Sequence, residues 1–461
     1  MVSSWRRLET VERFFVRSQM HGGSPDFSAE ADFDGILDAE VMKRAVDSVL
    51  PMHPLLSSKV HQIAGHMTWQ DVGSVNLFQH EHVNILDKSS VGCSFLSPPK
   101  FMDVSSHAGL AVRLTTSANS RSRLRFEYHH ACTDGQGGAR FYRDVTMAYA
   151  GLLSGNPKHF STDCDALAKR GIFNIPKGEQ PIGLREGLRN LWVTVRGENH
   201  RIAAIDRNPE SVHSAKPDEQ LVAQFVLDRR QTEAIHEFLL RSKHVMNDVM
   251  LSATFIMLTK FSTPRSSRAF VNILNPVDLR TWSDRRSTAC NRVGFAFVRR
   301  RTSDCQTPAM LLQSVAEQLR YVRKRGVAAE LMKGIQLIEK FPFALRWSEE
   351  SGRFTPTATV TCLSNLQLGR RHGVQFDGGQ WTLAGAKVDR VACIAPLPAG
   401  VPLAITVTDA NGKMVITMRA TRSHFDEDRL ERFGESLCAS CEEICRSKFS
   451  VCKSNGIQFD S

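Results

Sequence analysis

Residues 123–138 read RLRFEYHHACTDGQGG, and this stretch decides how the rest of the chain is interpreted. Positions 124, 126 and 128 are apolar and positions 123, 125 and 127 are charged, which is the alternation of a half-buried strand. Continuing that phase places His130 on the apolar face and His129 on the more polar one. Glycines then interrupt the pattern, and residues 141–153 have the spacing of a helix. The turn between strand and helix is therefore the candidate functional site.

The residue types in this turn fit acid–base chemistry. An imidazole titrates near about 6.5, so His130 would be a competent general base at neutral pH. Asp134 has two alternatives: it orients His130 directly, or it locks the loop by pairing with a distant arginine. Gly135 would permit close backbone approach or a positive φ. We predict His130 and Asp134 as catalytic residues, with His129 and Gly135 supporting them.

Other interpretations of the turn are weaker. Cys132 lies between the histidines and the aspartate, where a buried side chain is more typical of packing than of a nucleophile. Adjacent strand residues point to opposite faces, so His129 and His130 are poorly placed to share a metal ion. No G-x-S-x-G nucleophile motif is present. The alternative without function is that the two histidines only satisfy hydrogen bonds at the end of the strand.

Composition and charge restrict the class of protein. Of the 461 residues, 42% are hydrophobic and 23% are charged, which argues against a disordered or fibrous chain. No apolar run approaches the roughly 18 residues of a transmembrane helix, and no secretion signal is visible. The net charge of +11 favours anionic partners, but the basic clusters at 299–301 and 323–325 lack the aromatics of a nucleic-acid binder. A cytoplasmic protein that binds no nucleic acid is expected.

The cysteines are interpreted as free thiols. There are 11 of them, an odd number without a secretion signal, which suits a reducing compartment. Near the C-terminus their spacing could suggest a metal or iron–sulfur site, but apolar residues in the same segment recur three and four apart, as in an amphipathic helix. We therefore predict no metal site and interpret this segment as an amphipathic helix with cysteines on its apolar face. The clustered residues are Cys438, Cys441, Cys445 and Cys452.

The chain divides into two halves that each mix helices with a sheet. From about residue 155 to 220 the periodicity weakens and prolines are frequent, which is typical of an inter-domain region. The predicted limits are 1–165 for the half carrying the motif, 166–220 for a crossover or linker, and 221–461 for the second half. Helices are expected at 38–50, 141–153, 245–260 and 308–324, from 426 onward, and between the strand at 221–227 and about residue 240. Strands are expected at 221–227, 268–274, 292–298, 357–363, 381–386, 388–395, 403–408 and 414–418.

The HHxxxDG motif after a strand resembles the signature of the CoA-dependent acyltransferase superfamily. That superfamily includes chloramphenicol acetyltransferase, the condensation domains of nonribosomal peptide synthetases, and alcohol and wax-ester acyltransferases. The resemblance extends through most of the chain, with weaker matches at Ser364-Asn365 and Pro402-Leu403. The plant-type DFGWG and the wax-ester NVPGP runs are missing, and no carrier-protein or adenylation module is attached, so a stand-alone acyltransferase is favoured over any named subtype. Similar segments are HPLL at 53–56, VMNDVML at 245–251, NPVDLR at 275–280 and NRVG at 291–294.

The resemblance implies an α+β fold of two chloramphenicol acetyltransferase-like domains arranged in a V, with a tunnel between them and His130 at its centre. It implies that Asp134 is chiefly structural and pairs with Arg280. It also implies acyl transfer from an acyl-CoA or acyl-phosphopantetheine thioester to a hydroxyl or amine, with His130 as base and no permanently bound cofactor. Candidate oxyanion or substrate-binding residues are Asn247, Asn291, Ser364 and Asn365.

The expected partners are a small-molecule acceptor and the acyl thioester, with an acyl carrier protein as a further candidate and a monomer as the expected state. Two alternatives stay open on the same fold. One is condensation between carrier-bound substrates, forming an amide or ester. The other is a non-catalytic binding module, since a fold does not guarantee an activity.

Overall fold

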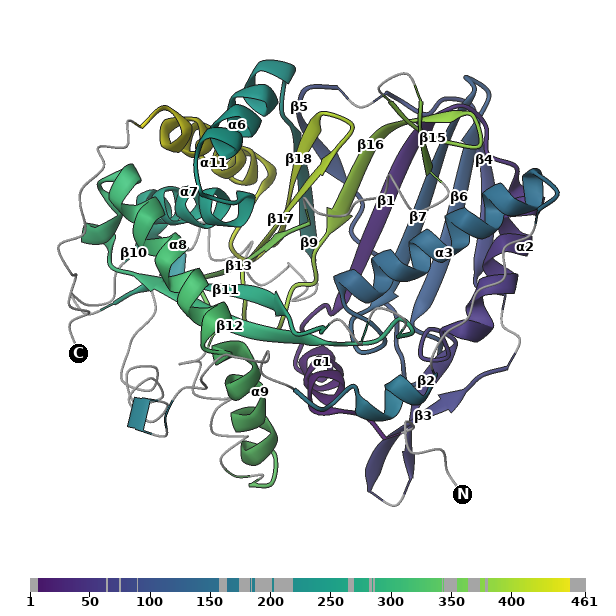
Figure 1. Ribbon diagram of the computed structural model, residues 1–461, viewed down its shortest axis with the longest axis horizontal. Coiled ribbons are helices and arrows are strands. Elements are labelled where there is room, and N and C mark those ends of the chain that lie inside the picture. The colour runs from purple at the N-terminus through teal and green to yellow at the C-terminus, as the bar shows by residue number, and fades with distance from the viewer. Residues whose placement is uncertain are drawn as a thin grey trace, which may run out of the picture.

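The structure is a computed structural model of the whole chain (Figure 1). It describes residues 7–447 apart from 64, 74–75, 89, 157–163, 174–182, 184, 187–200, 203–218, 264–268, 282–283, 285–286, 342, 344–354, 364–373 and 378–379. Within that part of the chain, no helix is long and apolar enough to cross a membrane.

The first half is a seven-stranded sheet covered on one face by α2 (Ala39–Val49) and α3 (Gly135–Leu153) (Figure 1). Apolar residues on one face of β7 pack against these helices: the ring of Phe126 lies 5.9 Å from that of Phe141 and 5.0 Å from that of Tyr142. In spatial order the strands are β14 (Val374–Asp377), β15 (Gln380–Leu383), β16 (Ala386–Ile394), β1 (Asp26–Asp34), β7 (Arg121–His129), β6 (Leu110–Ser117) and β4 (Phe78–Val83).

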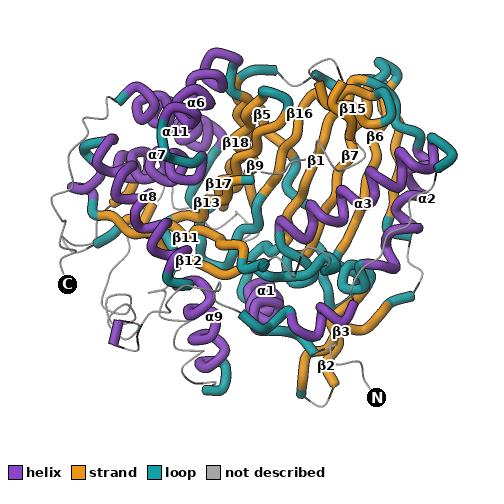
Figure 2. Tube along the Cα trace, viewed as in Figure 1, coloured by secondary structure: helices purple, strands orange, loops and turns teal. Residues whose placement is uncertain are grey.

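The second half is another seven-stranded sheet with its own helical layer, which Figure 2 shows beside the first. Its core is built around α7, whose residues 248–258 are all buried. The helices are α6 (Arg229–Arg241), α7 (Met246–Phe261), α8 (Pro308–Lys324) and α11 (Glu427–Arg446). The strands, in order, are β12 (Val293–Arg300), β11 (Val271–Asp278), β13 (Ala358–Cys362), β17 (Leu403–Ala410), β18 (Lys413–Thr421), β9 (Gln220–Val226) and β5 (Gly92–Leu96).

Smaller elements connect and flank the two sheets. Helices α1 and α9 lie together at the lower edge of Figure 1, between the halves. The elements are α1 (Thr10–Met20), α9 (Val327–Ile338), the pair β2 (Ser58–Ile63) and β3 (His66–Asp71), the pair β8 (Arg201–Ile202) and β10 (Ser262–Thr263), and the short helices η2 (Leu50–Met52), η3 (Cys164–Lys169) and η5 (Thr302–Cys305).

The two sheets exchange strands. β16 comes late in the sequence but pairs antiparallel with β1 of the first sheet, and β5 comes early but pairs antiparallel with β9 of the second. The predicted halves, 1–165 and 221–461, therefore do not coincide with the sheets strand for strand. Strand β16, from residues 221–461, joins the first sheet, and strand β5, from residues 1–165, joins the second. The limits of the two predicted halves stay a prediction.

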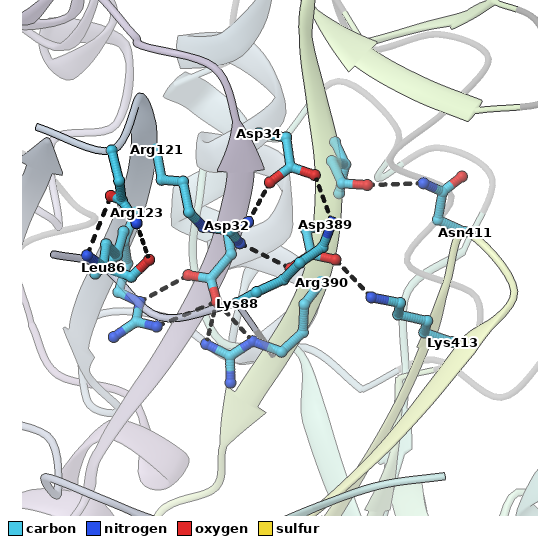
Figure 3. Close-up of polar contacts among 12 residues, drawn as sticks. Asp32, Asp34, Leu86, Lys88, Arg121, Arg123, Asp389, Arg390, Asn411 and Lys413 are labelled. Carbon is cyan, nitrogen blue, oxygen red and sulfur yellow. Dashed lines mark hydrogen bonds and ion pairs between the residues drawn. The ribbon is translucent and has the colours of Figure 1, made fainter. Parts of the chain in front are cut away.

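Buried ion pairs fix the exchanged strand β16 in place (Figure 3). Arg390 of β16 lies 2.7 Å from the Asp32 carboxylate and 2.5 Å from that of Glu30, both on β1. It also donates to Gln224 of β9 in the second sheet. Asp32 and Arg390 are buried, and removing one partner of a buried ion pair costs about 3–5 kcal/mol. Arg390 therefore links the exchanged strand β16 both to β1 of its own sheet and to β9 of the other sheet.

The α+β class with two sheet-and-helix halves, predicted from the sequence, is confirmed. The helix expected at 38–50 is α2, and Asp38 caps it by accepting a hydrogen bond from the Val41 N–H. The helix expected at 308–324 has those bounds. The helix expected from 141 begins earlier, at Gly135, because Asp134 caps it. The sequence patterns missed the helices α1 and α9 and the strands β1 to β6.

Candidate active site

The turn after β7 is shaped by Asp134, which serves as the N-cap of α3. Its Oδ1 accepts a hydrogen bond of 2.8 Å from the Gly137 N–H. Carboxylates are favoured there because the first N–H groups of a helix lack partners and the helix dipole attracts negative charge. The strand, the turn and the helix are thus held as one unit by this side chain.

The second oxygen of Asp134 binds the other half of the molecule. Oδ2 accepts 2.8 Å from Arg280 Nη1 and 2.7 Å from the backbone N–H of Arg292. Burial alone would raise the pKa of Asp134, but Arg280 and the hydrogen bonds hold it below its usual range. Arg280 also donates to the Cys290 carbonyl at 2.8 Å. Of the two roles left open by the sequence, the contacts match loop locking, because no Asp134 hydrogen bond reaches the His130 ring.

His130 follows β7 directly and lines the central cavity. Phe15 of α1 stacks on its ring, with centroids 3.9 Å apart and planes inclined by 22°, and Phe27 lies 5.1 Å away. The Nδ1 atom is buried and makes no hydrogen bond within the described residues. Burial lowers the pKa of His130 to about 4, against the smaller opposing effect of Asp134. The imidazole is therefore neutral at pH 7 and able to accept a proton.

His129 lies on the opposite face of β7, across from Asp26 in the β1–β7 register. Its Nδ1 accepts a hydrogen bond of 3.1 Å from the Ala131 N–H, so Nε2 carries the hydrogen that is donated to Gln19 Oε1 at 3.1 Å. Burial lowers the pKa of His129 to about 3. Both ring nitrogens are occupied, which suits an anchor for the turn rather than a proton acceptor.

A cavity of about 440 Å³ lies where the two halves meet. Strands β1, β7 and β16 with helices α1 and α3 supply its wall from the first half. Helices α7 and α8 with strands β11, β12 and β13 supply most of the wall from the second. The lining is largely apolar, and its size suits a small molecule or an acyl chain. The candidate base His130 thus opens onto a chamber that neither half forms alone.

Asn291 is hydrogen-bonded to the backbone of the turn and is not among the residues that line the cavity. Its Nδ2 donates to the carbonyl of His130 at 2.6 Å and to that of Ala131 at 2.9 Å. Both amide hydrogens are used, so they are not available to an oxyanion. These contacts support the turn, and the oxyanion or substrate-binding role of Asn291 stays a prediction that they do not favour.

Of the other predicted residues, some line the cavity and some lie outside the described part of the chain. Asn247, near the start of α7, lines the cavity, and its side chain makes no hydrogen bond to the described residues. Ser364 and Asn365 lie outside the described residues. Gly135 lines the cavity, but its φ is not positive and a Cβ there would meet only a Leu363 methyl at an ordinary 3.6 Å.

The glycine that the turn requires is Gly137 instead. A Cβ at Gly137 would lie 2.2 Å from Thr133 Oγ1 and 2.8 Å from the Cys290 carbonyl oxygen. Such contacts leave no room for a side chain, and the backbone atoms cannot give way. The sequence pattern located the tight turn but assigned it to the wrong glycine.

Sequence reasoning also missed Phe15, although a signal was present. Val11 and Phe15 are four residues apart and both are buried on α1, the spacing of an amphipathic helix. Nothing in the sequence indicates that this helix crosses to the end of β7. Only the fold brings the Phe15 ring onto His130.

No cysteine among the described residues is placed to act as a nucleophile: Cys362 and Cys393 line the cavity as buried or half-buried thiols, and burial raises the pKa of each. Burial raises the pKa of the Cys132 thiol well above its usual range, so the nucleophilic thiolate is not formed. Cys441 is buried in the core of the second half, with Cys438 and Cys445 packed against it. Cys452 lies outside the described residues, and among those described no cluster of His, Cys, Asp and Glu could hold a metal ion.

Comparison with known proteins finds acyl-group transferases by sequence and condensation domains by structure. No family model matches the chain. Phthiocerol/phthiodiolone dimycocerosyl transferases of Mycobacterium tuberculosis and Mycobacterium bovis are 24% identical over 283 residues. The match spans 60% of this chain and 62% of the relatives, which is less than two thirds of their length.

Solved structures match over almost the whole chain. The first condensation domain of the calcium-dependent antibiotic synthetase with a bound substrate analogue has a TM-score of 0.70 at 16% identity, covering 95% of this chain and 96% of that one. A variant of the starter condensation domain of rhizomide synthetase RzmA, in complex with C8-CoA and Leu-SNAC, has a TM-score of 0.64 at 14% identity, covering 96% and 94%. Polyketide synthase associated protein 5 from Mycobacterium tuberculosis has a TM-score of 0.60 at 17% identity, covering 95% and 97%. The chain therefore has the condensation-domain fold, as the resemblance to the CoA-dependent acyltransferase superfamily implied.

Proposed function

We propose that this chain transfers an acyl group from a thioester to a hydroxyl or amine, with His130 as the general base. The observation that carries the proposal is a neutral imidazole opening onto a largely apolar cavity between two halves. The names of the matched relatives support it, since one is a transferase of mycocerosyl groups and another is a fold neighbour bound to C8-CoA.

The mechanism needs no covalent enzyme intermediate. As the acceptor oxygen or nitrogen attacks the thioester carbonyl carbon, its proton passes to His130. The tetrahedral intermediate then collapses, the carbon–sulfur bond breaks, and His130 returns the proton to the departing sulfur. The products are the ester or amide and a free thiol, and His130 is again neutral. General base catalysis of this kind contributes typically about 10²–10⁴-fold.

The intermediate oxyanion requires a hydrogen-bond donor about 3 Å away. Asn247 is the best of the predicted candidates within the described residues, because its amide lines the cavity and is not committed to another contact. Its place near the N-terminus of α7 adds the positive end of the helix dipole. We assign the donor role to Asn247 in place of Asn291.

Asp134 and Arg280 act on the shape of the site rather than on the transferred proton. Their ion pair of 2.8 Å joins the turn of the first half to the segment after β11 of the second. The carboxylate also favours the imidazolium that forms during the reaction, since it raises the pKa of His130 relative to burial alone.

The proposed co-substrate is an acyl-CoA or an acyl-phosphopantetheine, with no permanently bound cofactor. Arg323 of α8 is exposed, lines the cavity and forms no ion pair with the described residues. Together with the net charge of +11, it suits an anionic phosphate at the cavity mouth. The acyl chain would then lie along the apolar wall.

The test is a thiol-release assay with acyl-CoA substrates of graded chain length, combined with mass spectrometry of the acylated acceptor. Alcohols and amines are offered in turn as acceptors. Release that depends on the acceptor and is lost in His130→Gln, while His129→Asn retains it, is the expected result. Equal activity of His130→Gln and the parent chain would overturn the role of His130.

Carrier-dependent condensation is the second candidate, and the match to condensation domains over 95% of the chain favours it. The same assay with acyl-phosphopantetheinyl carrier protein in place of acyl-CoA separates the two donors. Product from the carrier-bound donor alone would select condensation. Saturable binding of both substrates without any product would select the non-catalytic module.

A further inference from the structure

His130 lacks the usual support of a catalytic imidazole. Among the described residues no carboxylate hydrogen-bonds to its ring, and both oxygens of Asp134 are bound to Gly137, Arg280 and Arg292. Its Nδ1 is buried without a hydrogen bond to the described residues. The Asn291 side chain and the His130 backbone favour the charged imidazole, but neither makes a hydrogen bond of normal geometry to Nδ1. A packing contact is therefore needed to fix the plane in which the ring meets a substrate.

We infer that Phe15 is the positioning residue for His130: its stacked ring fixes the plane of the imidazole and keeps water off one face of it. The inference rests on the proposed role of His130 as the base. The centroid separation of 3.9 Å and the inclination of 22° are those of a close parallel stack. No other aromatic ring in the described part of the chain lies as near to His130, since Phe27 is 5.1 Å away and tilted by 54°.

Phe15 is itself held from both sides. Phe14 meets its ring edge-on at 5.2 Å, and Phe295 of β12 meets it at 6.4 Å. Phe15 is 2% exposed, so its ring is confined by packing from the second half as well as by its own helix. A confined ring can transmit its orientation to the imidazole stacked on it.

Helix α1 is also anchored to the second half by charge. The carboxylate of Glu339, directly after α9, accepts 2.6 Å from Arg13, 2.8 Å from Arg17 and 2.8 Å from the Thr10 hydroxyl. Burial would raise the pKa of Glu339, but Arg13 and Arg17 hold it below its usual range. Glu339 therefore stays ionised, and α1 stays docked with Phe15 against the base.

Two effects of Phe15 on the ionisation of His130 oppose each other. Excluding water disfavours the charged imidazolium, whereas the face of an aromatic ring attracts a cation. The pKa of His130 is lowered overall, with burial as the largest cause, so exclusion of water dominates. Removing the ring altogether should therefore raise this pKa, while replacing it by an aliphatic side chain of similar size should not. The other charged or titratable groups around the ring, unchanged in either case, are Glu30, Tyr128, His129, Asp134 and Arg280.

The experiment follows the His130 ring by NMR in full-length protein labelled with ¹³C at histidine Cε1, with the signal assigned by its loss in His130→Gln. In Phe15→Ala the pKa of His130 should rise by about one unit or more toward the ordinary value near 6.5. In Phe15→Leu it should stay within about half a unit, since the ring remains covered. In both variants kcat should fall about tenfold or more with little change in KM, because the base is no longer held in plane.

Val16→Ala is the matched control, since Val16 is a buried neighbour on the same helix but is not among the residues that line the cavity with Phe15 and His130. It should leave the His130 titration unchanged even if it lowers Tm. A Phe15→Ala variant whose His130 titration and kcat both equal those of the parent would overturn the inference. If the parent chain transfers no acyl group at all, the proposed function fails, and the NMR titration alone still decides whether Phe15 controls His130.

Discussion

The two faces of β7 end in adjacent histidines that share burial but little else. On the charged face, opposite Asp26, His129 uses both ring nitrogens in hydrogen bonds. On the apolar face, His130 has an unpaired Nδ1 and opens onto the cavity. Nearly all buried polar atoms in proteins are satisfied, so an unsatisfied one requires an explanation. The difference supports the proposal that the His130 face, which opens onto the cavity, is the one used for chemistry.

The largest expected effect tests this comparison directly. His130→Gln should lower kcat by about 10²–10⁴-fold, since it removes the only proposed general base. His129→Asn should lower it much less, because an Asn oxygen can still accept the hydrogen bond from the Ala131 N–H. The measurement is thiol release at saturating substrate, with circular dichroism to verify the fold of each variant. Equal losses in the two variants would contradict a functional difference between the faces.

The alternation of residues 123–130 was enough to predict which histidine lies on which face. It also predicted a strand, turn and helix around the motif, because those signals are local. The Asp134–Arg280 contact spans 146 residues and came only from the family resemblance. The stack of Phe15 on His130 and the exchange of β16 onto β1 were not predicted. Each depends on how distant elements pack, and no local pattern encodes that.

The oxyanion candidates show the same limit. Asn291 and Asn247 are both asparagines at matched motif positions, and nothing in the local sequence distinguishes their roles. Their surroundings do: Asn291 donates to two backbone carbonyls, whereas Asn247 lines the cavity. A residue type indicates what chemistry is available, but the packing decides whether the atoms are already committed.

The next prediction sharpens the comparison by showing that the motif aspartate belongs to the framework. Arg280→Met should lower the free energy of unfolding by about 3–5 kcal/mol, because it leaves the buried Asp134 carboxylate without its counter-charge. Asp134→Asn should lower it less, because Arg280 is only partly buried and keeps Asp278 at 3.1 Å. The double variant should lose clearly less than the sum of the two. Urea unfolding of the four proteins measures the cycle. Additive losses would mean that the 2.8 Å ion pair contributes no coupling.

A smaller effect is expected when the cavity beside the apolar face of β7 is narrowed and both histidines are kept. A Cβ at Gly138 would already lie 3.2 Å from the Tyr128 ring and 3.4 Å from that of Phe27. Gly138→Trp should therefore fill the cavity beside His130 and raise KM for one substrate by about 10–100-fold, a discrimination within reach of apolar pockets. Gly138→Ala is the control and should change KM little. Equal rises in KM for donor and acceptor would count against a wall used by one substrate.

The last prediction uses the protons that the histidines bind when the protein unfolds. Burial holds the pKa of His129 at about 3 in the folded state, whereas an unfolded histidine titrates near about 6.5. Between those values the unfolded chain binds more protons, so stability present above pH 6.5 is lost as the pH falls. From pH 7 to 5 the expected loss from His129 is about 2 kcal/mol. Asp26, whose pKa burial raises to about 7, contributes with the opposite sign.

Because these terms oppose each other, the prediction concerns the difference between variants. His129→Asn removes one acid-sensitive group and keeps Asp26, so its free energy of unfolding should fall about 2 kcal/mol less than that of the parent between pH 7 and 5. Urea denaturation at half-unit pH intervals measures both curves. His130, whose pKa is also lowered by burial, remains in both proteins and cancels. Parallel curves would mean that His129 is not buried as a neutral ring, and the contrast between the two faces would then rest on hydrogen bonding alone.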